Sequence, residues 1–207
     1  AFVDELGASY KKRTYCVQYR ETDFDFVSRL MEEEGILYYW RHAEDKHEMV
    51  LADKLSSHKT VAGFEEIPYN QGNKDLVGVR AIAHWQMRRE IQTGKVTLSD
   101  YNFETPGTSL KSTTVASSRS HVQNAHEVYD YPGLYGVKAD GDAQAQIRLD
   151  EASARFARFA GQGDTPGLAA GTRFKLTRHQ RNDQNAEYLV LRTQIEMTLA
   201  GYTTSNK

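Results

Sequence analysis

Apolar residues recur at helical spacing near the N-terminal end of the chain, in the stretch TDFDFVSRLMEEEG. Phe24, Val27 and Met31 fall on one face of a helix drawn through this stretch, and charged residues take the opposite face. Thr22 is a favourable N-cap, and Gly35 supplies the left-handed residue at which helices commonly end. The pattern therefore predicts an amphipathic helix between Thr22 and Gly35.

A second run with helical spacing predicts a longer helix from Asp142 (about 142–160), ending at Gly161. Charged side chains fill most positions on one side of this run, which is typical of the solvent-facing side of a surface helix. The expected buried stripe on the other side consists of Leu149, Ala152, Phe156 and Phe159.

Most of the remaining chain alternates between apolar and polar residues, which is the pattern of half-buried antiparallel strands. Ile36–His42 and Glu48–Asp53 flank the polar turn AEDK and are expected to form a β-hairpin. A longer strand is predicted over residues 79–91. The apolar face of this strand consists of Val79, Ala81, Ala83, Trp85, Met87 and Ile91.

After Gln92–Gly94 the chain is expected to return as a strand with the sequence KVTLSDYNF. Val96 and Leu98 share one face of this strand, whereas Tyr101 and Phe103 have the opposite parity. A β-bulge near Asp100 would reconcile the two halves, because a bulge inserts one extra residue into a strand. Bulges also bend strands at the rims of barrels.

The C-terminal region has the most regular alternation in the chain. A strand is predicted over Ala186–Leu199, paired with Thr172–Arg178. Phe174 and Leu176 are expected to point inward from the second of these segments. A long strand of this kind needs an edge partner or a cover to avoid aggregation, and a neighbouring subunit would supply one.

Together these elements predict an α+β chain dominated by β-structure. Long strands, a bulge and few helices favour a closed or nearly closed antiparallel β-barrel. Pro68–Lys74 is the best candidate boundary between a helix-plus-hairpin subdomain, residues 1–70, and a barrel domain, residues 71–207, with the longer helix inserted. Because the chain starts without Met and stops soon after a strand-like run, we expect it to be a piece of a longer protein.

The composition is that of an ordinary globular chain: 39% of the 207 residues are hydrophobic, 26% are charged, and the formal net charge is −2. The balanced charge gives no general attraction to nucleic acid or an anionic membrane, and no apolar run is long enough to span a bilayer. A nucleic-acid-binding barrel that uses Arg80, Arg88 and Arg89 stays as an alternative, and it predicts salt-sensitive binding.

Histidines are the first residues to consider for metal binding. His42 and His47 lie at opposite ends of a hairpin, His58 follows in a polar loop, and no helix holds these residues at i, i+4. We expect exposed turn histidines here. His121 and His126 are five residues apart and would not share a helix face. No metal ion or cofactor is therefore predicted.

Candidates for covalent or acid–base catalysis are equally weak. Cys16, the single cysteine, lies in a strand-like run and is expected to be a small buried or half-buried residue. Glu32–Glu34 point in different directions at a helix end, whereas the paired carboxylates of a glycosidase flank one bond. Gly161–Gly171 follows a helix and precedes a strand, which is the wrong order for a phosphate-binding loop. No catalytic residue is predicted.

A hydrolase that acts on cell-wall or glycan material is a second alternative. Its least unfavourable site would use His42, His47 and Asp53, which lie near one predicted hairpin. Alanine substitution at His47 and Asp53 distinguishes such a hydrolase from a protein with a purely structural role. Loss of a hydrolytic activity without loss of folding would contradict a structural role.

One stretch of the chain contains specific sequence motifs in addition to its periodic pattern. Val17–Trp40 reads VQYRETDFDFVSRLMEEEGILYYW, and HEMVLAD follows at His47–Asp53. This combination resembles the VgrG proteins of type VI secretion systems, which are relatives of the baseplate hubs of contractile phages. The family's run is a Gln–Tyr pair, E-[ST]-D-x-[DN]-F, R-L-x-E-E-x-G and an aromatic strand. Here these features are Gln18 and Tyr19, Glu21–Phe26, Arg29–Gly35 and Tyr38–Trp40.

The resemblance covers nearly the whole chain. It continues through the strand around Trp85 and the segments Lys95–Gly107, Glu127–Gly136 and Gly171–Leu191. The departures are at the ends, because family members carry a further β-barrel before residue 1, and an oligosaccharide-binding-type barrel and a β-helical needle after residue 207. The chain thus resembles the inner part of a hub.

The resemblance implies a structural and docking module of phage baseplate-hub type, without enzymatic activity. The implied partners are two further copies in a full-length homotrimer, a hexameric tail-tube protein, baseplate components and delivered effectors, with no nucleic acid and no stable membrane anchor. Two barrels per chain in a trimer would match a three-fold spike to a six-fold tube. Assembly in the bacterial cytoplasm and translocation into the medium or a target cell would follow. A hub of a contractile phage or phage-derived particle shares the fold and stays an alternative.

Overall fold

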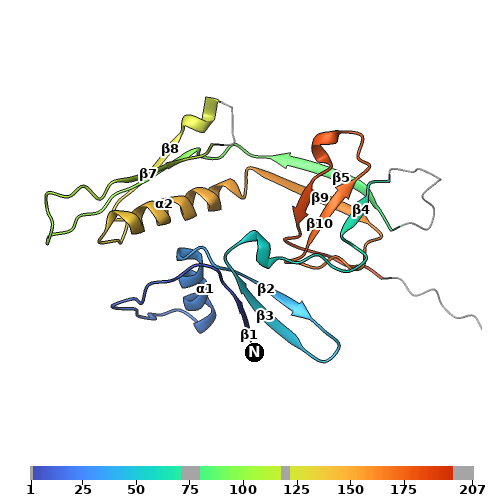
Figure 1. Ribbon diagram of the computed structural model, residues 1–207, viewed down its shortest axis with the longest axis horizontal. Helices are drawn as coiled ribbons and strands as arrows, with labels where there is room; N and C mark the ends of the chain where they lie inside the picture. The colour runs from blue at the N-terminus through green and yellow to red at the C-terminus, as the bar shows by residue number, and fades with distance from the viewer. Residues whose placement is uncertain (1, 71–79, 118–121, 198–207) are drawn as a thin grey trace, which may run out of the picture.

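The computed structural model of the chain describes residues 2–70, 80–117 and 122–197 (Figure 1). In these ranges it contains the helices α1 (Asp23–Glu33) and α2 (Lys138–Ser153), and strands that belong to four separate sheets. Figure 1 shows three groups of elements: the N-terminal strands beside α1, the strands packed on α2, and a third group at the other end of the molecule. Short 3-10 turns occur at Leu55–Ser57, Val122–Ala125 and Asn182–Gln184.

The N-terminal group is a three-stranded sheet in the order β1 (Phe2–Glu5), β3 (His47–Ala52) and β2 (Leu37–His42). β2 and β3 pair antiparallel around the AEDK turn, so the predicted hairpin is confirmed. β1 runs parallel to β3 on its other side, which makes β3 the central strand. Val50 and Ala52 of β3 are consequently fully buried.

Helix α1 forms where the sequence predicts it. The backbone N–H of Asp25 donates to Oγ1 of Thr22 at 3.2 Å, so Thr22 caps the first turn. At the other end Gly35 has a φ of 71°, a left-handed conformation that ends helices and that glycine adopts without steric cost. The sequence signals for both ends of this helix are therefore confirmed.

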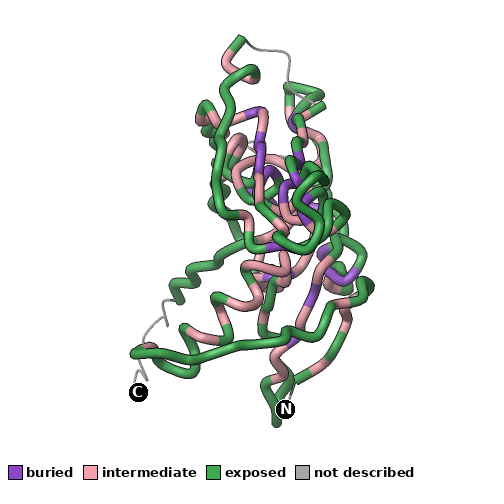
Figure 2. The backbone as a smooth tube through the Cα atoms, turned by 90° about the vertical axis from the view of Figure 1, so that its left-hand side faces the viewer, coloured by how far each residue is buried: buried purple, intermediate pink, exposed green. Residues whose placement is uncertain are grey.

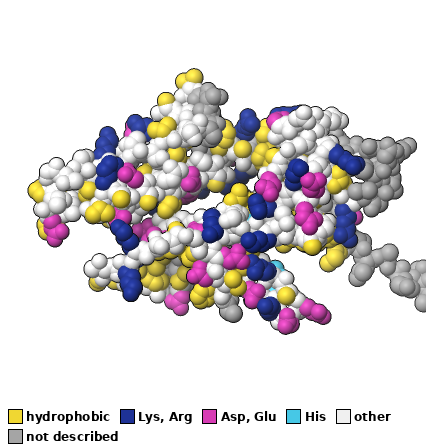
Figure 3. Space-filling view, in the orientation of Figure 1, with side chains coloured by type: hydrophobic (Ala, Val, Ile, Leu, Met, Phe, Trp, Pro, Cys, Tyr) yellow, Lys and Arg dark blue, Asp and Glu magenta, His cyan; other side chains and the backbone are white. Residues whose placement is uncertain are grey.

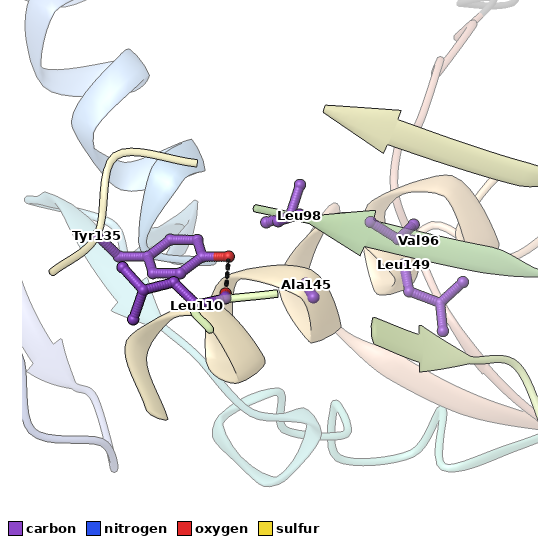
Figure 4. Close-up of a cluster of buried hydrophobic side chains, with 6 residues drawn as sticks. All are labelled: Val96, Leu98, Leu110, Tyr135, Ala145 and Leu149. Carbon is purple, nitrogen blue, oxygen red and sulfur yellow. Dashed lines mark hydrogen bonds between the residues drawn. The ribbon is translucent and has the colours of Figure 1, made fainter. Parts of the chain in front are cut away.

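The second group is built on a sheet in the order β7 (Ser112–Val115), β6 (Lys95–Leu98) and β8 (Glu127–Asp130). Helix α2 packs against β6 and β7. Figure 4 shows the apolar side chains that fill the space between them, and the Tyr135 hydroxyl donates to the Leu110 carbonyl at 2.7 Å. The cluster consists of Val96, Leu98, Leu110, Tyr135, Ala145 and Leu149.

The third group combines two sheets. One has the order β11 (Glu187–Leu189), β10 (Arg173–Thr177) and β4 (Glu66–Pro68), and the other pairs β5 (Ile82–Arg89) with β9 (Ala157–Gly163). β10 and β11 form the predicted antiparallel pair, and Phe174 and Leu176 are buried as predicted. The cluster between the sheets consists of Phe64, Ile67, Ile82, Phe174 and Leu176.

The longer helix differs from its prediction at both ends. α2 begins at Lys138 and ends at Ser153, and the residues predicted to form its last turns form strand β9. In that strand Phe159 stacks on Trp85 of β5, with ring centroids 5.5 Å apart. This tertiary contact outweighs the helical spacing of the segment. Of the predicted stripe of Leu149, Ala152, Phe156 and Phe159, the helix buries Leu149 alone, and its other buried residues are Gly141 and Ala145.

The predicted closed antiparallel barrel is not formed by the described residues. The strands make four sheets of two or three strands each, and three of these sheets contain a parallel pair. β5 pairs with β9, far along the chain, and not with the segment that follows it. Alternation in a sequence identifies strands but not their partners, which explains why the barrel prediction is wrong.

The predicted bulge at Asp100 is also wrong. β6 ends at Leu98, and the Asp100 carboxylate accepts the backbone N–H groups of Leu134 at 2.6 Å and Tyr135 at 3.3 Å. The change of parity after Leu98 thus marks the end of the strand. The loop that follows is held in place by hydrogen bonds to the Asp100 carboxylate. A register irregularity does occur, but between Ile82 and His84 of β5.

Only the first part of the predicted C-terminal strand is observed. β11 covers Glu187–Leu189, and Val190 still pairs with the backbone of Thr172. Residues 191–197 are all exposed and are not part of a strand, and Leu199 lies outside the described residues. The division of the chain into residues 1–70 and 71–207 stays a prediction.

Candidate assembly surfaces

The structure separates the residues of the predicted hydrolase site. His47 begins strand β3 and Asp53 follows its last residue, so the length of the strand, about 20 Å, lies between them. Asp53 instead binds the segment after β1: its carboxylate accepts the backbone N–H groups of Gly7 at 2.8 Å and Ala8 at 2.7 Å, and the hydroxyl of Tyr10 at 2.9 Å. Asp53 therefore has a structural role.

These hydrogen bonds change the protonation of both side chains. Desolvation by itself would raise the pKa of Asp53, but the hydrogen bonds from Ala8, Gly7 and Tyr10 outweigh it and lower that pKa. For Tyr10, burial and then the hydrogen bond to the Asp53 carboxylate raise the pKa above its usual value. Both shifts favour the same state, an ionised carboxylate bound to a neutral phenol.

The histidines behave differently from one another. His42 and His47 are exposed, as predicted, but the hairpin brings their Nδ1 atoms within 2.6 Å of each other. His58 contradicts the prediction of an exposed turn residue, because it is only 4% exposed. Its Nδ1 lies 2.9 Å from the Gly171 carbonyl, and its ring packs on Tyr39. His121 lies outside the described residues.

The other catalytic candidates are not assembled into a site. Cys16 is exposed and lies outside the strands, so the prediction of a buried strand residue is wrong. Glu33 and Glu34 form ion pairs with Arg13, and Gly161–Gly163 form the end of β9. Among the described residues no group of three or more metal-ligating side chains occurs. In the same residues no helix is long and apolar enough to cross a membrane.

The arginines of the predicted nucleic-acid stripe are divided between the two ends of β5, with Arg80 at one end and Arg88 and Arg89 at the other. Arg80 precedes β5 and lies over the ring of Phe64, 4.9 Å from its centroid. Arg88 is near the other end of β5, opposite Arg158 of β9, and forms an ion pair with Glu90 at 2.8 Å. The cations therefore do not form one continuous track along which a single strand could bind.

Many large apolar side chains of the described residues are exposed. Figure 2 shows that the buried residues form short, separate stretches of the backbone. A shape of this kind leaves much apolar surface in contact with water, which is typical of a subunit that is completed by assembly.

One exposed apolar surface lies on α1 and the neighbouring hairpin. None of the α1 residues is buried, although the helix is strongly amphipathic. Phe24 is 62% exposed, and its ring meets that of Tyr38 edge-on with centroids 6.2 Å apart. We call this surface the α1 face; its exposed apolar residues are Phe24, Val27, Tyr38 and Trp40.

A second exposed apolar surface lies at the far end of the sheet that carries α2. The Asp100 carboxylate fixes the loop that presents Leu134, which has a φ of 62° and is 77% exposed. Figure 3 shows apolar side chains at this end of the molecule and at several other places in the same view. We call this surface the distal face; its exposed apolar residues are Tyr101, Phe103, Tyr129, Tyr131, Leu134 and Val137.

A groove of about 710 Å³ lies between β9, β11 and the segment 191–197. Its floor is aromatic, formed by Trp85, Phe159, Phe174 and Tyr188 in mutual ring contact. One wall consists of the exposed segment that the sequence predicts to be a strand. An aromatic floor beside an unpaired segment fits a packing surface better than a catalytic pocket, which requires convergent polar groups.

Comparison with known protein families identifies one match. The family of phage tail baseplate hub proteins (GPD) matches residues 1–200, which is nearly the whole chain.

Two of the most similar relatives come from Pseudomonas aeruginosa and Vibrio cholerae. The type VI secretion system spike protein VgrG1b of Pseudomonas aeruginosa is 40% identical over 203 residues, which are 98% of this chain and 27% of that protein. The actin cross-linking toxin VgrG1 of Vibrio cholerae serotype O1 is 33% identical over 180 residues, which are 87% of this chain and 16% of that protein. The chain thus spans less than a third of the length of these relatives.

A solved structure shows the same fold. The 43 kDa tail protein of prophage MuSo2 from Shewanella oneidensis matches with a TM-score of 0.60, covering 91% of this chain and 55% of that chain, at 9% sequence identity. At this identity the likeness concerns the fold alone.

Proposed function

The chain belongs to the phage tail baseplate hub family and is homologous to VgrG spike proteins of type VI secretion systems, and from this premise we propose that it forms the hub at the base of such a spike. The observation that carries the proposal is the family match over residues 1–200, because it covers both exposed apolar faces. The chain is 40% identical to a spike protein of a type VI secretion system but only 9% identical to the tail protein of prophage MuSo2. This difference favours a role in a secretion system over a role in a phage particle.

We propose that the full-length protein is a homotrimer that docks on a hexameric tail-tube protein. Two similar lobes per chain in a trimer give six lobes around one axis, which allows matched contacts to a six-fold ring. The exposed α1 face and distal face support this proposal, since groups of exposed apolar side chains are characteristic of surfaces that are buried on assembly.

Baseplate components and delivered effectors are the further partners in this proposal. The module transmits force through many distributed contacts and has no catalytic role. It is assembled in the bacterial cytoplasm and then leaves the cell with the spike. We also propose that residues 1–70 and 71–207 are separate subdomains of the hub.

Secretion of the tube protein tests the function. Deletion of the gene for the full-length protein should abolish release of the tube protein into the medium, and the wild-type gene should restore it. A double variant with His47→Ala and Asp53→Ala that folds should restore release as well, because neither residue acts in catalysis. Unchanged release after deletion would contradict the hub proposal.

A further inference from the structure

Two histidines lie side by side next to the turn of the β2–β3 hairpin. His42 and His47 are directly opposite each other in the antiparallel register, so both side chains leave the sheet on the same face. Their Nδ1 atoms are 2.6 Å apart, and their rings meet edge-on with centroids separated by 4.7 Å. Two imidazole nitrogens thus face one point in space, and both side chains are exposed to solvent.

The residues around this pair form a closed turn with paired charges. The Ala43 N–H donates to the Lys46 carbonyl at 2.9 Å, which closes the hairpin turn directly beyond the two histidines. The neighbouring cations are neutralised, because Arg41 pairs with Glu5 at 2.8 Å and Lys46 pairs with Glu48 at 3.0 Å. The turn itself adds two carboxylates, Glu44 and Asp45. The cationic side chains next to the histidines are therefore paired, and the turn is acidic.

From this geometry we propose that His42 and His47 chelate one divalent transition-metal ion of the imidazole-preferring class, such as Zn²⁺, through their Nδ1 atoms. Zinc–nitrogen bonds of about 2.0–2.1 Å at a tetrahedral angle place the two nitrogens about 3.4 Å apart. The observed separation of 2.6 Å has to widen by less than about 1 Å. Rotation of two exposed side chains accomplishes this while the backbone register stays unchanged.

The protons balance without a further reactant. In the metal-free pair one Nδ1–H donates to the other Nδ1, so the two facing nitrogens share one proton. When the metal binds, that proton moves to Nε2 of the same ring. Both rings stay neutral, and each Nδ1 gives its lone pair to the metal. The metal takes the place of the proton between the rings.

The site supplies two ligands and leaves the others to water. No group of three ligating side chains occurs among the described residues, so a tetrahedral ion keeps two exchangeable positions here. Imidazole ligands favour Zn²⁺, Cu²⁺ and Ni²⁺ over Mg²⁺ and Ca²⁺, which prefer oxygen ligands. This inference is independent of the hub proposal, since it depends only on the hairpin.

Calorimetric titration of the purified chain with ZnCl₂ tests the site, with MgCl₂ as the comparison cation. We expect one Zn²⁺ per chain and no binding of Mg²⁺. His42→Gln and His47→Gln should each weaken Zn²⁺ binding by about a hundredfold, because the second ligand of a chelate acts at a high effective concentration. His84→Gln, which removes an exposed histidine of β5, is the matched control and should leave the affinity unchanged.

Several outcomes would overturn the inference. These are a Zn²⁺ affinity that both substitutions leave unchanged, an affinity that the control lowers equally, binding of Mg²⁺ with similar strength, and a stoichiometry of one ion per two chains. Because both histidines are exposed, the variants should fold, and their circular dichroism spectra should match that of the wild-type chain. Cu²⁺ should bind more tightly than Zn²⁺ to the same pair and should compete with it.

Discussion

Two aspartates hold loops to strands through backbone N–H groups. Asp53 binds the segment after β1, and Asp100 binds the loop that presents Leu134. Hydrogen bonds to an ionised acceptor are about twice as strong as those between neutral groups, so each carboxylate can position a segment that has few apolar contacts. In a chain with small cores, single polar residues of this kind determine which loops are presented and where.

Asp53→Asn should destabilise the fold in a pH-dependent way. The folded-state pKa of Asp53 lies below its usual value, so the ionised carboxylate stabilises the fold above about pH 4, and this contribution is lost as the pH falls through the folded pKa. We expect a loss of about 1 kcal/mol in the free energy of unfolding at pH 7, and a smaller loss at pH 3, measured by urea unfolding. Asp45→Asn in the hairpin turn is the control. An equal loss at both pH values would contradict this assignment.

Gly141→Ala should destabilise the chain although it improves helix propensity. A Cβ atom at Gly141 would overlap the Tyr135 ring and the Ser112 hydroxyl, both of which are buried. Overpacking costs about 1–3 kcal/mol, which exceeds the gain of about 1 kcal/mol from replacing a helical glycine. The expected net loss is about 1 kcal/mol by chemical unfolding. Gly107→Ala, where a Cβ would meet nothing within 4 Å, should be close to neutral. A stabilising Gly141→Ala would mean that the ring moves aside.

At the scale of elements, local signals predicted local structure. Thr22 and Gly35 define α1, and the AEDK turn and the paired alternation define the β2–β3 hairpin, because caps and turns depend on adjacent residues. The end of α2 could not be predicted in this way. Phe159 has helical spacing from Ala152 and Phe156, but it lies in a strand because Trp85, far away in the sequence, stacks on it.

For the candidate site residues too, the sequence predicts what adjacent residues determine and misses what contacts between distant segments determine. The sequence places His42 and His47 on either side of a turn, but only the register of the hairpin shows that they are directly opposite. The burial of His58 depends on its contacts with Tyr39 and Gly171. The α1 face is exposed because no other segment of the described residues covers it. No pattern within a single segment reports such contacts, since they are made between segments.

Segment 191–197 should change its hydrogen-exchange behaviour with its surroundings. Its alternating sequence favours a strand, yet in this chain it is exposed and unpaired by any strand of the described residues. Its amides should therefore exchange quickly in the 207-residue chain and slowly in the full-length protein, where we expect a partner strand. Mass-spectrometric exchange compares the two proteins, with β10 as a slow reference in both. Equally fast exchange in the full-length protein would contradict the expected pairing.

At the scale of the whole molecule, the described residues form two small apolar cores in a chain of 207 residues. Neither core includes α1, and the two faces defined above extend along the molecule outside them. Stability and assembly are therefore coupled, because apolar surface that folding leaves exposed is the surface that association removes from water.

The solution mass of this chain should exceed 23.5 kDa and rise with concentration in a light-scattering series. Phe24→Ser on the α1 face and Leu134→Ser on the distal face should each lower the mass at a given concentration, since a few apolar side chains carry most of the energy of an interface. Both side chains are exposed, so neither change should unfold the chain, and Lys111→Ser is the exposed polar control. The face whose substitution has the larger effect is the one through which copies associate. A wild-type mass of 23.5 kDa at every concentration would contradict association through these faces alone and would assign assembly to regions outside this chain.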